Sequence, residues 1–215
     1  MSPVPGPYTP GADEGREGRP GPFAVLEGVS GVGKSTLTRL VAKRLGGTTI
    51  HTLTDPHTGW SDVINRELQS LPQFAFYLSG LMHVSDVVRQ RLREGPMVAD
   101  RYTSSVVACH SAVNRVDLDQ VKALIAPFRP YLVAPDVTFY LVSSDRSLRQ
   151  RMGTKTDVKQ DDTDLFDVPG RLALLRENFQ TVADQDPSAV MLPTDGRSPD
   201  DLADIIINHL EERRA

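Results

Sequence analysis

The stretch GVSGVGKS, at positions 28–35, constrains the fold of this chain more than any other part of its sequence. It satisfies the pattern G-x-x-x-x-G-K-[ST]. It lies between the apolar run 23–27, which predicts a buried strand, and the segment 33–45, whose apolar residues have helical spacing. A loop in this setting turns backbone N–H groups around a phosphate, and the positive end of the following helix adds to the attraction. The stretch therefore predicts a nucleoside triphosphate site within an α/β fold.

The loop and the first helical turn supply the candidate cofactor-binding residues. Lys34 would place its charge between the β- and γ-phosphates, and the Ser35 hydroxyl would be a ligand of Mg²⁺. ATP with Mg²⁺ is therefore the predicted phosphoryl donor. The residues predicted to hold it are Gly28, Gly31, Val32, Gly33, Lys34, Ser35 and Thr36.

Short apolar runs alternate with segments of helical spacing along residues 23–215. Because strands that alternate with helices form a parallel sheet covered on both faces, we expect a doubly wound α/β fold with five parallel strands. A length of 215 residues suits one such domain. The runs that predict strands are 23–27, 48–53, 97–100, 136–142 and 189–194.

The composition argues against several kinds of partner. A net charge of −4 is unlike that of proteins that bind nucleic acid. The single cysteine, Cys109, excludes an internal disulfide and fits a reducing cytoplasm. No apolar run is long enough to span a membrane, and the start of the chain lacks a signal-peptide pattern. Residues 1–22 are rich in Pro and Gly, which predicts a disordered leader before a domain at 23–215.

The phosphate loop alone does not separate kinases from GTPases or motor ATPases. The chain has no room for a coupled motor domain, which favours a small kinase. No NKxD-like guanine reader follows any predicted strand, which argues against a GTPase. We therefore expect a small P-loop kinase.

Three stretches indicate which kind of kinase this is. They are LEGVSGVGKST (26–36), VADRYTSS (98–105) and PDVTFYLVSSDRSLRQRM (135–152). In this order and spacing they resemble the thymidylate kinase family of nucleoside monophosphate kinases. The resemblance implies a five-stranded parallel core, a homodimer, and transfer of the ATP γ-phosphoryl group to a nucleoside monophosphate.

The resemblance also implies roles for individual residues. Asp100 would lie near Mg²⁺ or the transferring group, and Arg101 would grip the acceptor phosphate. Segment 153–164 would be the lid over ATP, and loop 193–198 would lie beside the adenine. The candidate catalytic residues are Lys34, Asp55, Asp100, Arg101, Arg149 and Arg151, with Lys155 as a further lid cation, and the metal candidates are Ser35 and Asp100. The candidate substrate-binding residues are Asp55, Phe76, Gly80, Arg101, Tyr102, Ser105 and Cys109.

Some of these residues also suit structural roles. Phe76 matches the aromatic residue that stacks on the acceptor base in the family, but its helical neighbours are apolar, so it could equally belong to the core. Arg149 and Arg151 could be solvated charges on a short helix. Both interpretations stay open at the level of the sequence.

The sequence departs from the family pattern on the acceptor side. Ser30 stands where the family commonly has an Asp, and Gly80 stands where an Arg reads the pyrimidine O4. Cys109 and His110 replace a Tyr-Gln pair. Because a base edge without a hydrogen-bond partner loses about 1–3 kcal/mol, the acceptor need not be dTMP.

Asp55 keeps a second kind of acceptor open. It precedes Pro56 and Trp60 with a spacing that resembles the deoxynucleoside kinases, in which a Glu is the base for a sugar hydroxyl. An alcohol must lose its proton as it attacks, whereas a monophosphate is already an anion. Asp55 could be that base, or it could cap a turn before Pro56. A third alternative is a homologue that binds nucleotide without catalysis.

Overall fold

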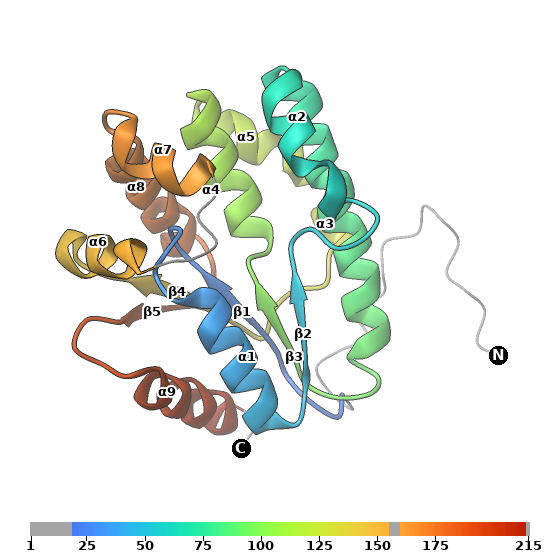
Figure 1. Ribbon diagram of the computed structural model, residues 1–215. Helices are drawn as coiled ribbons and strands as arrows, with labels where there is room; N and C mark the ends of the chain where they lie inside the picture. Colours follow the sequence, from blue (N-terminus) through green and yellow to red (C-terminus); the bar gives the residue numbers. More distant parts are fainter. Residues whose placement is uncertain (1–18, 155–159, 214–215) are drawn as a thin grey trace, which may run out of the picture.

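The computed structural model describes residues 19–154 and 160–213. In chain order the elements are β1 (Phe23–Glu27), α1 (Lys34–Leu45), β2 (Thr48–His51), η1 (Thr58–Trp60), α2 (Ser61–Glu67), α3 (Ser70–Arg91), β3 (Met97–Asp100), α4 (Thr103–Asn114), α5 (Leu118–Ile125), η2 (Ala126–Tyr131), β4 (Val137–Val142), α6 (Asp145–Gly153), α7 (Gln160–Asp167), α8 (Arg171–Asp184), β5 (Ala189–Pro193) and α9 (Pro199–Glu212) (Figure 1). The predicted alternation of strands and helices is confirmed.

The five strands form one parallel sheet in the order β2-β3-β1-β4-β5. Central strand β1 pairs with β3 on one side and β4 on the other, and Ala24 faces both Val98 and Val137. The chain therefore leaves β1 and β3 side by side at the carboxyl edge of the sheet. Open α/β sheets bind ligands at such an edge.

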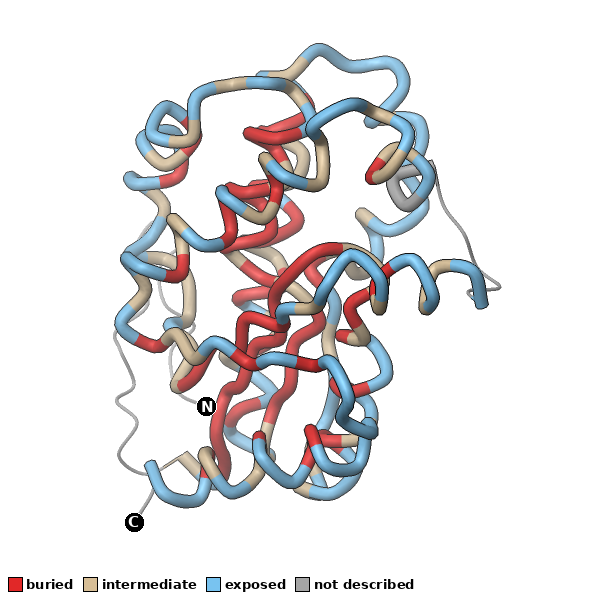
Figure 2. Tube along the Cα trace, turned by 90° about the vertical axis from the view of Figure 1, so that its left-hand side faces the viewer, coloured by how far each residue is buried: buried red, intermediate tan, exposed pale blue. Residues whose placement is uncertain are grey.

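Alternate residues of β1 enter different cores. Ala24 and Leu26 pack in a cluster with α1, α8 and α9, whereas Phe23 and Val25 pack in a cluster with α3 and α5. Because successive side chains of a strand point to opposite faces, this alternation requires helices on both faces of the sheet. Figure 2 shows the buried residues concentrated in the central strands and the helices against them. The predicted two-sided cover is confirmed.

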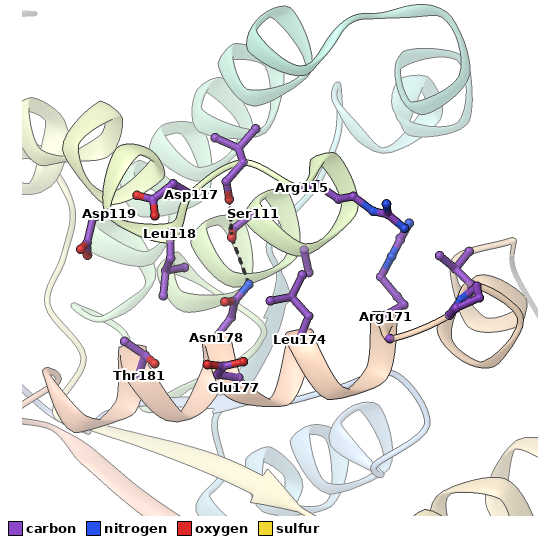
Figure 3. A pocket seen from close by; sticks show the side chains of 15 residues that line it. Ser111, Arg115, Asp117, Leu118, Asp119, Arg171, Leu174, Glu177, Asn178 and Thr181 are labelled. Carbon is purple, nitrogen blue, oxygen red and sulfur yellow. Dashed lines mark hydrogen bonds between the residues drawn. The ribbon is translucent and has the colours of Figure 1, made fainter.

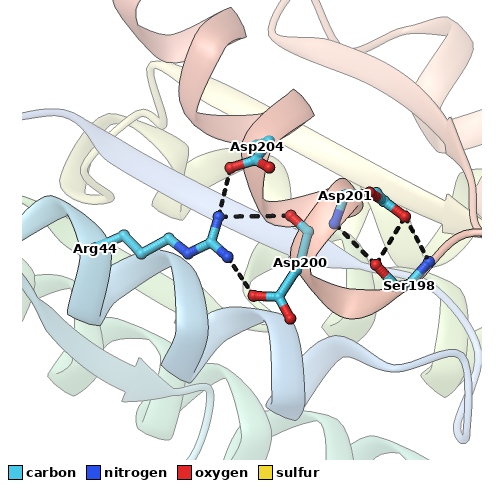
Figure 4. Close-up of polar contacts among 5 residues, drawn as sticks. All are labelled: Arg44, Ser198, Asp200, Asp201 and Asp204. Carbon is cyan, nitrogen blue, oxygen red and sulfur yellow. Dashed lines mark hydrogen bonds and ion pairs between the residues drawn. The ribbon is translucent and has the colours of Figure 1, made fainter.

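Helix α9 is fixed at its start and along its side (Figure 4). The Ser198 hydroxyl accepts the backbone N–H of Asp201 and donates to its carboxylate, as the sequence predicts for a cap followed by Pro199. Arg44, in the last turn of α1, bridges Asp200 and Asp204 of α9. The helix that follows the phosphate loop is thereby joined to the last helix of the chain.

The long helical region after β2 differs in detail from its prediction. The sequence predicts a break near Pro72, but the break lies at positions 68–69, and Pro72 belongs to the first turn of α3. A proline is tolerated there because the N–H groups of a first turn have no partner within the helix.

Most of the predicted leader, 1–18, lies outside the described residues, as do Lys155 and the rest of 155–159 in the predicted lid. At 19–22 the backbone already packs against the fold, since the carbonyl of Pro22 accepts the N–H of Met97. None of the helices in the described part of the chain combines the length and the apolar character that a bilayer-spanning segment needs.

Candidate active site

The phosphate loop closes tightly against the end of β4 and against α6. Gly28 has φ 131° and Gly31 has φ 78°, values that L side chains rarely adopt. A Cβ at Gly28 would lie 2.6 Å from the carbonyl oxygen of Leu141, and one at Gly31 would overlap Met152. Glycine is required at both positions for backbone geometry and for space.

Lys34 begins α1 and turns back into the loop. Its Nζ donates to the carbonyl oxygens of Gly28 (2.9 Å) and Val29 (2.7 Å). Burial, and next the charge of Arg101, lower the pKa of Lys34 to about 7. A phosphate at this position would supply the negative charge that favours the ammonium form.

Ser35 and Asp100 meet across the carboxyl edge of β1 and β3. The Ser35 hydroxyl donates to Oδ2 of Asp100, while Oδ1 of Asp100 is buried without a hydrogen-bond partner among the described residues. A buried carboxylate oxygen without a donor is costly unless a ligand completes it. No group of three or more His, Cys, Asp or Glu residues in the described chain could hold a metal ion on its own. A hard cation here would need phosphate or water oxygens besides Ser35 and Asp100, which fits Mg²⁺.

Arg101 follows Asp100 in a left-handed backbone conformation, with φ 70°. Its backbone N–H donates to Leu26. Its Nη1 lies 3.2 Å from the carbonyl oxygen of Gly28, 3.0 Å from Oγ of Ser105 and 3.9 Å from Sγ of Cys109. The structure thus brings together Arg101, Ser105, Cys109 and the phosphate loop.

Glu27 is a site residue that the sequence reasoning missed. It is fully buried at the end of β1, and its carboxylate accepts the backbone N–H groups of Tyr102 and Ser105 and the Ser105 hydroxyl. Helix α4 has no side-chain cap of its own, so Glu27 caps it from another element. Burial raises the pKa of Glu27, against its hydrogen bonds and the charge of Arg101. A charge at the end of an otherwise apolar run, FAVLE, was the available signal.

Tyr102 lies differently from its predicted place beside the acceptor. Its ring is buried in the core edge-to-face with Phe23, with ring centroids 5.3 Å apart. Burial raises the pKa of its hydroxyl to about 12. Tyr102 contributes to the site through its backbone N–H, which donates to the Glu27 carboxylate.

The two predicted lid arginines have different partners. Arg151 donates to the carbonyl oxygen of Val32 in the phosphate loop (3.1 Å) and to Thr194 on the loop after β5. Arg149 lies 4.5 Å from the ring centroid of Phe166, on α7. Arg151 therefore links the phosphate loop to the loop predicted to lie beside adenine. Arg149 instead makes a cation–π contact with α7.

Residues of the predicted acceptor side gather between the loop after β2 and α3. The ring of Phe76 packs against that of His57, with centroids 5.5 Å apart, and Phe76 lies in neither core cluster. A Cβ at buried Gly80 would lie 2.5 Å from Cδ2 of Leu53 and 3.6 Å from the His57 ring. Leu53 and His57 therefore fill the space in which an Arg at position 80 would begin.

Two histidine contacts connect the loop after β2 to α3. His57 Nε2 lies 3.1 Å from the Ser79 hydroxyl, and His83 Nε2 donates to the carbonyl oxygen of Asp55. The Asp55 residue is exposed. Asp55 and Phe76 thus lie on neighbouring segments, as both predicted acceptor roles require.

Comparisons with known proteins show which family this chain resembles. A family model described as thymidylate kinase matches residues 26–198. A probable thymidylate kinase of Methanococcoides burtonii is 27% identical over 81% of this chain and 89% of its own length. A thymidylate kinase of Leifsonia xyli subsp. xyli is 32% identical over 63% of this chain and 70% of its own length.

Two solved structures share the fold at lower identity. The thymidylate kinase of Candida albicans, described as having broad substrate specificity, has a TM-score of 0.73 at 17% identity, over 91% of this chain and 93% of its own. The deoxyadenosine kinase of M. mycoides has a TM-score of 0.64 at 18% identity, over 88% of this chain and 99% of its own.

Proposed function

Because this chain belongs to the thymidylate kinase family of nucleotide kinases, we propose that it transfers the γ-phosphoryl group of ATP, with Mg²⁺, to a nucleoside monophosphate. The observation that supports this most is the edge shared by β1 and β3. There Lys34 and Arg101 both donate to the carbonyl oxygen of Gly28, and Ser35 donates to Asp100, whose other carboxylate oxygen is buried without a donor among the described residues.

On the donor side, the backbone of loop 28–33 and Lys34 would surround the phosphates, and Thr36 would add its N–H. Lys34 would exchange the two loop carbonyls for phosphate oxygens. Ser35 and Asp100 would hold Mg²⁺, which when bound neutralises charge on the β- and γ-phosphates. Arg151, joined to Thr194, would fix the loop beside the adenine.

On the acceptor side, Arg101 would orient the monophosphate. Its guanidinium lies against the phosphate loop, and Ser105 and Cys109 line the helix beside it. Phosphoryl transfer depends mainly on positioning and on charge neutralisation, so one arginine between donor and acceptor serves both. Phe76 would stack on the acceptor base beside His57.

A second candidate acceptor is a nucleoside or another alcohol, with Asp55 as its base. The exposed Asp55 on a loop tied to α3 through His83 favours it, as does the fold shared with a deoxyadenosine kinase. The chemistry separates the two proposals, because an alcohol needs a base near its proton and a monophosphate does not.

The deciding experiment measures ADP release with Mg·ATP across monophosphates and their matching nucleosides, dTMP and thymidine included. Turnover on a monophosphate that survives in Asp55→Asn supports the first proposal. Turnover only on nucleosides, abolished in Asp55→Asn, supports the second. ATP binding without transfer to any acceptor would contradict both and indicate a binding protein.

The family resemblance is the basis of three further proposals, on the domain, the dimer and the location. One kinase domain would span residues 23–215, and it would form a homodimer in the cytoplasm. Light scattering of the purified full chain tests the dimer, since a monomer at the concentration of the assay would contradict it.

A further inference from the structure

A cavity of about 600 Å³ lies away from the candidate active site, between the end of α4, the turn into α5 and helix α8 (Figure 3). None of the residues assigned above to donor, metal or acceptor lines it. Its volume is within the range of sites that hold small molecules. The residues that give it its character are Arg115, Leu118, Arg171, Leu174, Glu177 and Asn178.

Two arginines converge at one end of this cavity. Figure 3 shows Arg115, from the end of α4, and Arg171, from the start of α8, pointing toward one another. Within the described residues, neither guanidinium has a hydrogen bond or an ion pair. Arg115 is exposed and Arg171 is half-buried, so water screens part of their repulsion, and an anion between the two guanidinium groups would stabilise the pair. A pair of guanidinium forks is also the arrangement that binds phosphate oxygens best.

The backbone adds to the same positive end. Arg171 is the first residue of α8, a helix of 14 residues, and its N-cap Gly170 offers no side chain to the free N–H groups. The helix dipole therefore strengthens the attraction that the arginine pair exerts on an anion.

The remainder of the cavity suits an uncharged ring and hydroxyl groups. Leu118 and Leu174 supply apolar walls, and Glu177, Asn178 and Thr181 lie toward the end away from the arginines (Figure 3). The other carboxylates are already used, because Asp117 caps α5 and Asp119 pairs with a lysine of the same helix. The cavity thus offers cations to a phosphate at one end and oxygen atoms to hydroxyl groups at the other.

We propose that this cavity binds a nucleoside phosphate separately from the donor and acceptor sites. The phosphate lies between Arg115 and Arg171, and the nucleoside lies along Leu174 toward Glu177. A ligand in this position would contact both α4 and α8. Because α4 also carries Ser105 and Cys109, the ligand would be connected to the acceptor side through that helix. The inference goes beyond the proposed kinase activity.

The test is a footprint of the full chain with phenylglyoxal, which modifies arginines, read by peptide mass spectrometry with and without ADP. ADP should slow modification of Arg115 and Arg171 about tenfold, as a phosphate bound to a charged donor implies. The control is Arg39, exposed on α1, whose rate should not change. Unchanged rates at Arg115 and Arg171 overturn the proposal.

Two further measurements distinguish binding in this cavity from binding at the phosphate loop. In Lys34→Ala, which lacks the loop cation, protection of Arg115 and Arg171 by ADP should persist, and its loss would assign the effect to the loop. Pyrophosphate should protect less than ADP at equal concentration. Equal protection would overturn the nucleoside part of the proposal.

Discussion

At the donor side of the candidate site, charged groups are buried and bonded to neighbouring backbone or hydroxyl groups, whereas at the acceptor side half-buried side chains pack against one another. Glu27 and Asp100 are buried at the ends of β1 and β3, and Lys34 is buried at the start of α1. Phe76 and His57 lie on α3 and a loop, and their contacts are ring packing with each other, with Tyr77 and with His83, together with the Ser79 hydroxyl. Changes on the acceptor side therefore disturb few other contacts, whereas changes on the donor side disturb the sheet edge.

The largest expected effect concerns the two cations beside the phosphates, Lys34 on the donor side and Arg101 between donor and acceptor. Lys34→Ala and Arg101→Ala should each lower kcat about a thousandfold or more while the protein stays folded, because neutralising charge on the phosphates is most of the catalysis. Turnover and circular dichroism measure the two properties. Arg39→Ala, on the exposed side of α1, is the matched control. Near-normal turnover in a folded Lys34→Ala would refute the donor assignment.

The next effect is on stability and contrasts Glu27 with Ser79. Glu27→Ala leaves the buried N–H groups of Tyr102 and Ser105, at the start of α4, without an acceptor, so we expect the free energy of unfolding to fall by about 3 kcal/mol. Ser79→Ala removes one exposed contact and should change it by less than about 0.5 kcal/mol. Urea denaturation measures both. Equal losses in the two variants would show that donor and acceptor sides are not built differently.

A third prediction concerns the acceptor base. Gly80→Arg alone should not improve dTMP as a substrate, because Leu53 occupies the space. Gly80→Arg combined with Leu53→Ala should raise kcat/KM for dTMP, relative to the best other monophosphate, about tenfold, the value of one charged hydrogen bond. Equal ratios in the double variant and the wild type would contradict the assignment of this pocket.

The smallest effect is a pH dependence of stability at His110, on α4. Burial lowers the pKa of His110, whose ring packs on Phe74 and whose Nδ1 lies 3.3 Å from Asn114. Below the ordinary pKa of about 6.5, the unfolded imidazole takes up a proton that the folded one resists. The free energy of unfolding should therefore decrease as pH falls below 6.5, by at most about 1.4 kcal/mol per pH unit. In His110→Gln this contribution to the pH dependence of the free energy of unfolding should vanish. Identical slopes in the variant and the wild type would refute the prediction.

The same contrast explains what could be predicted from the sequence. The five strands, the phosphate loop and the Asp100–Arg101 pair follow from local patterns, since strand ends of a parallel sheet meet at one edge. Glu27 was missed because its partners are 75 and 78 residues away in the chain. The ring of Tyr102 and the bonds of Arg151 to Thr194 depend on how distant elements pack, which no local pattern reports. The acceptor side depends almost entirely on such packing.

The backbone conformation of Arg101 has a cost in stability. Its left-handed backbone, at φ 70°, costs a non-glycine residue about 1–2 kcal/mol. Arg101→Gly should relieve this strain, but it also removes the contacts of the guanidinium with the Gly28 carbonyl oxygen and the Ser105 hydroxyl, and the variant should be less active. The presence of arginine in that conformation marks a position where the fold gives up stability for the side chain, a trade-off visible in a single chain.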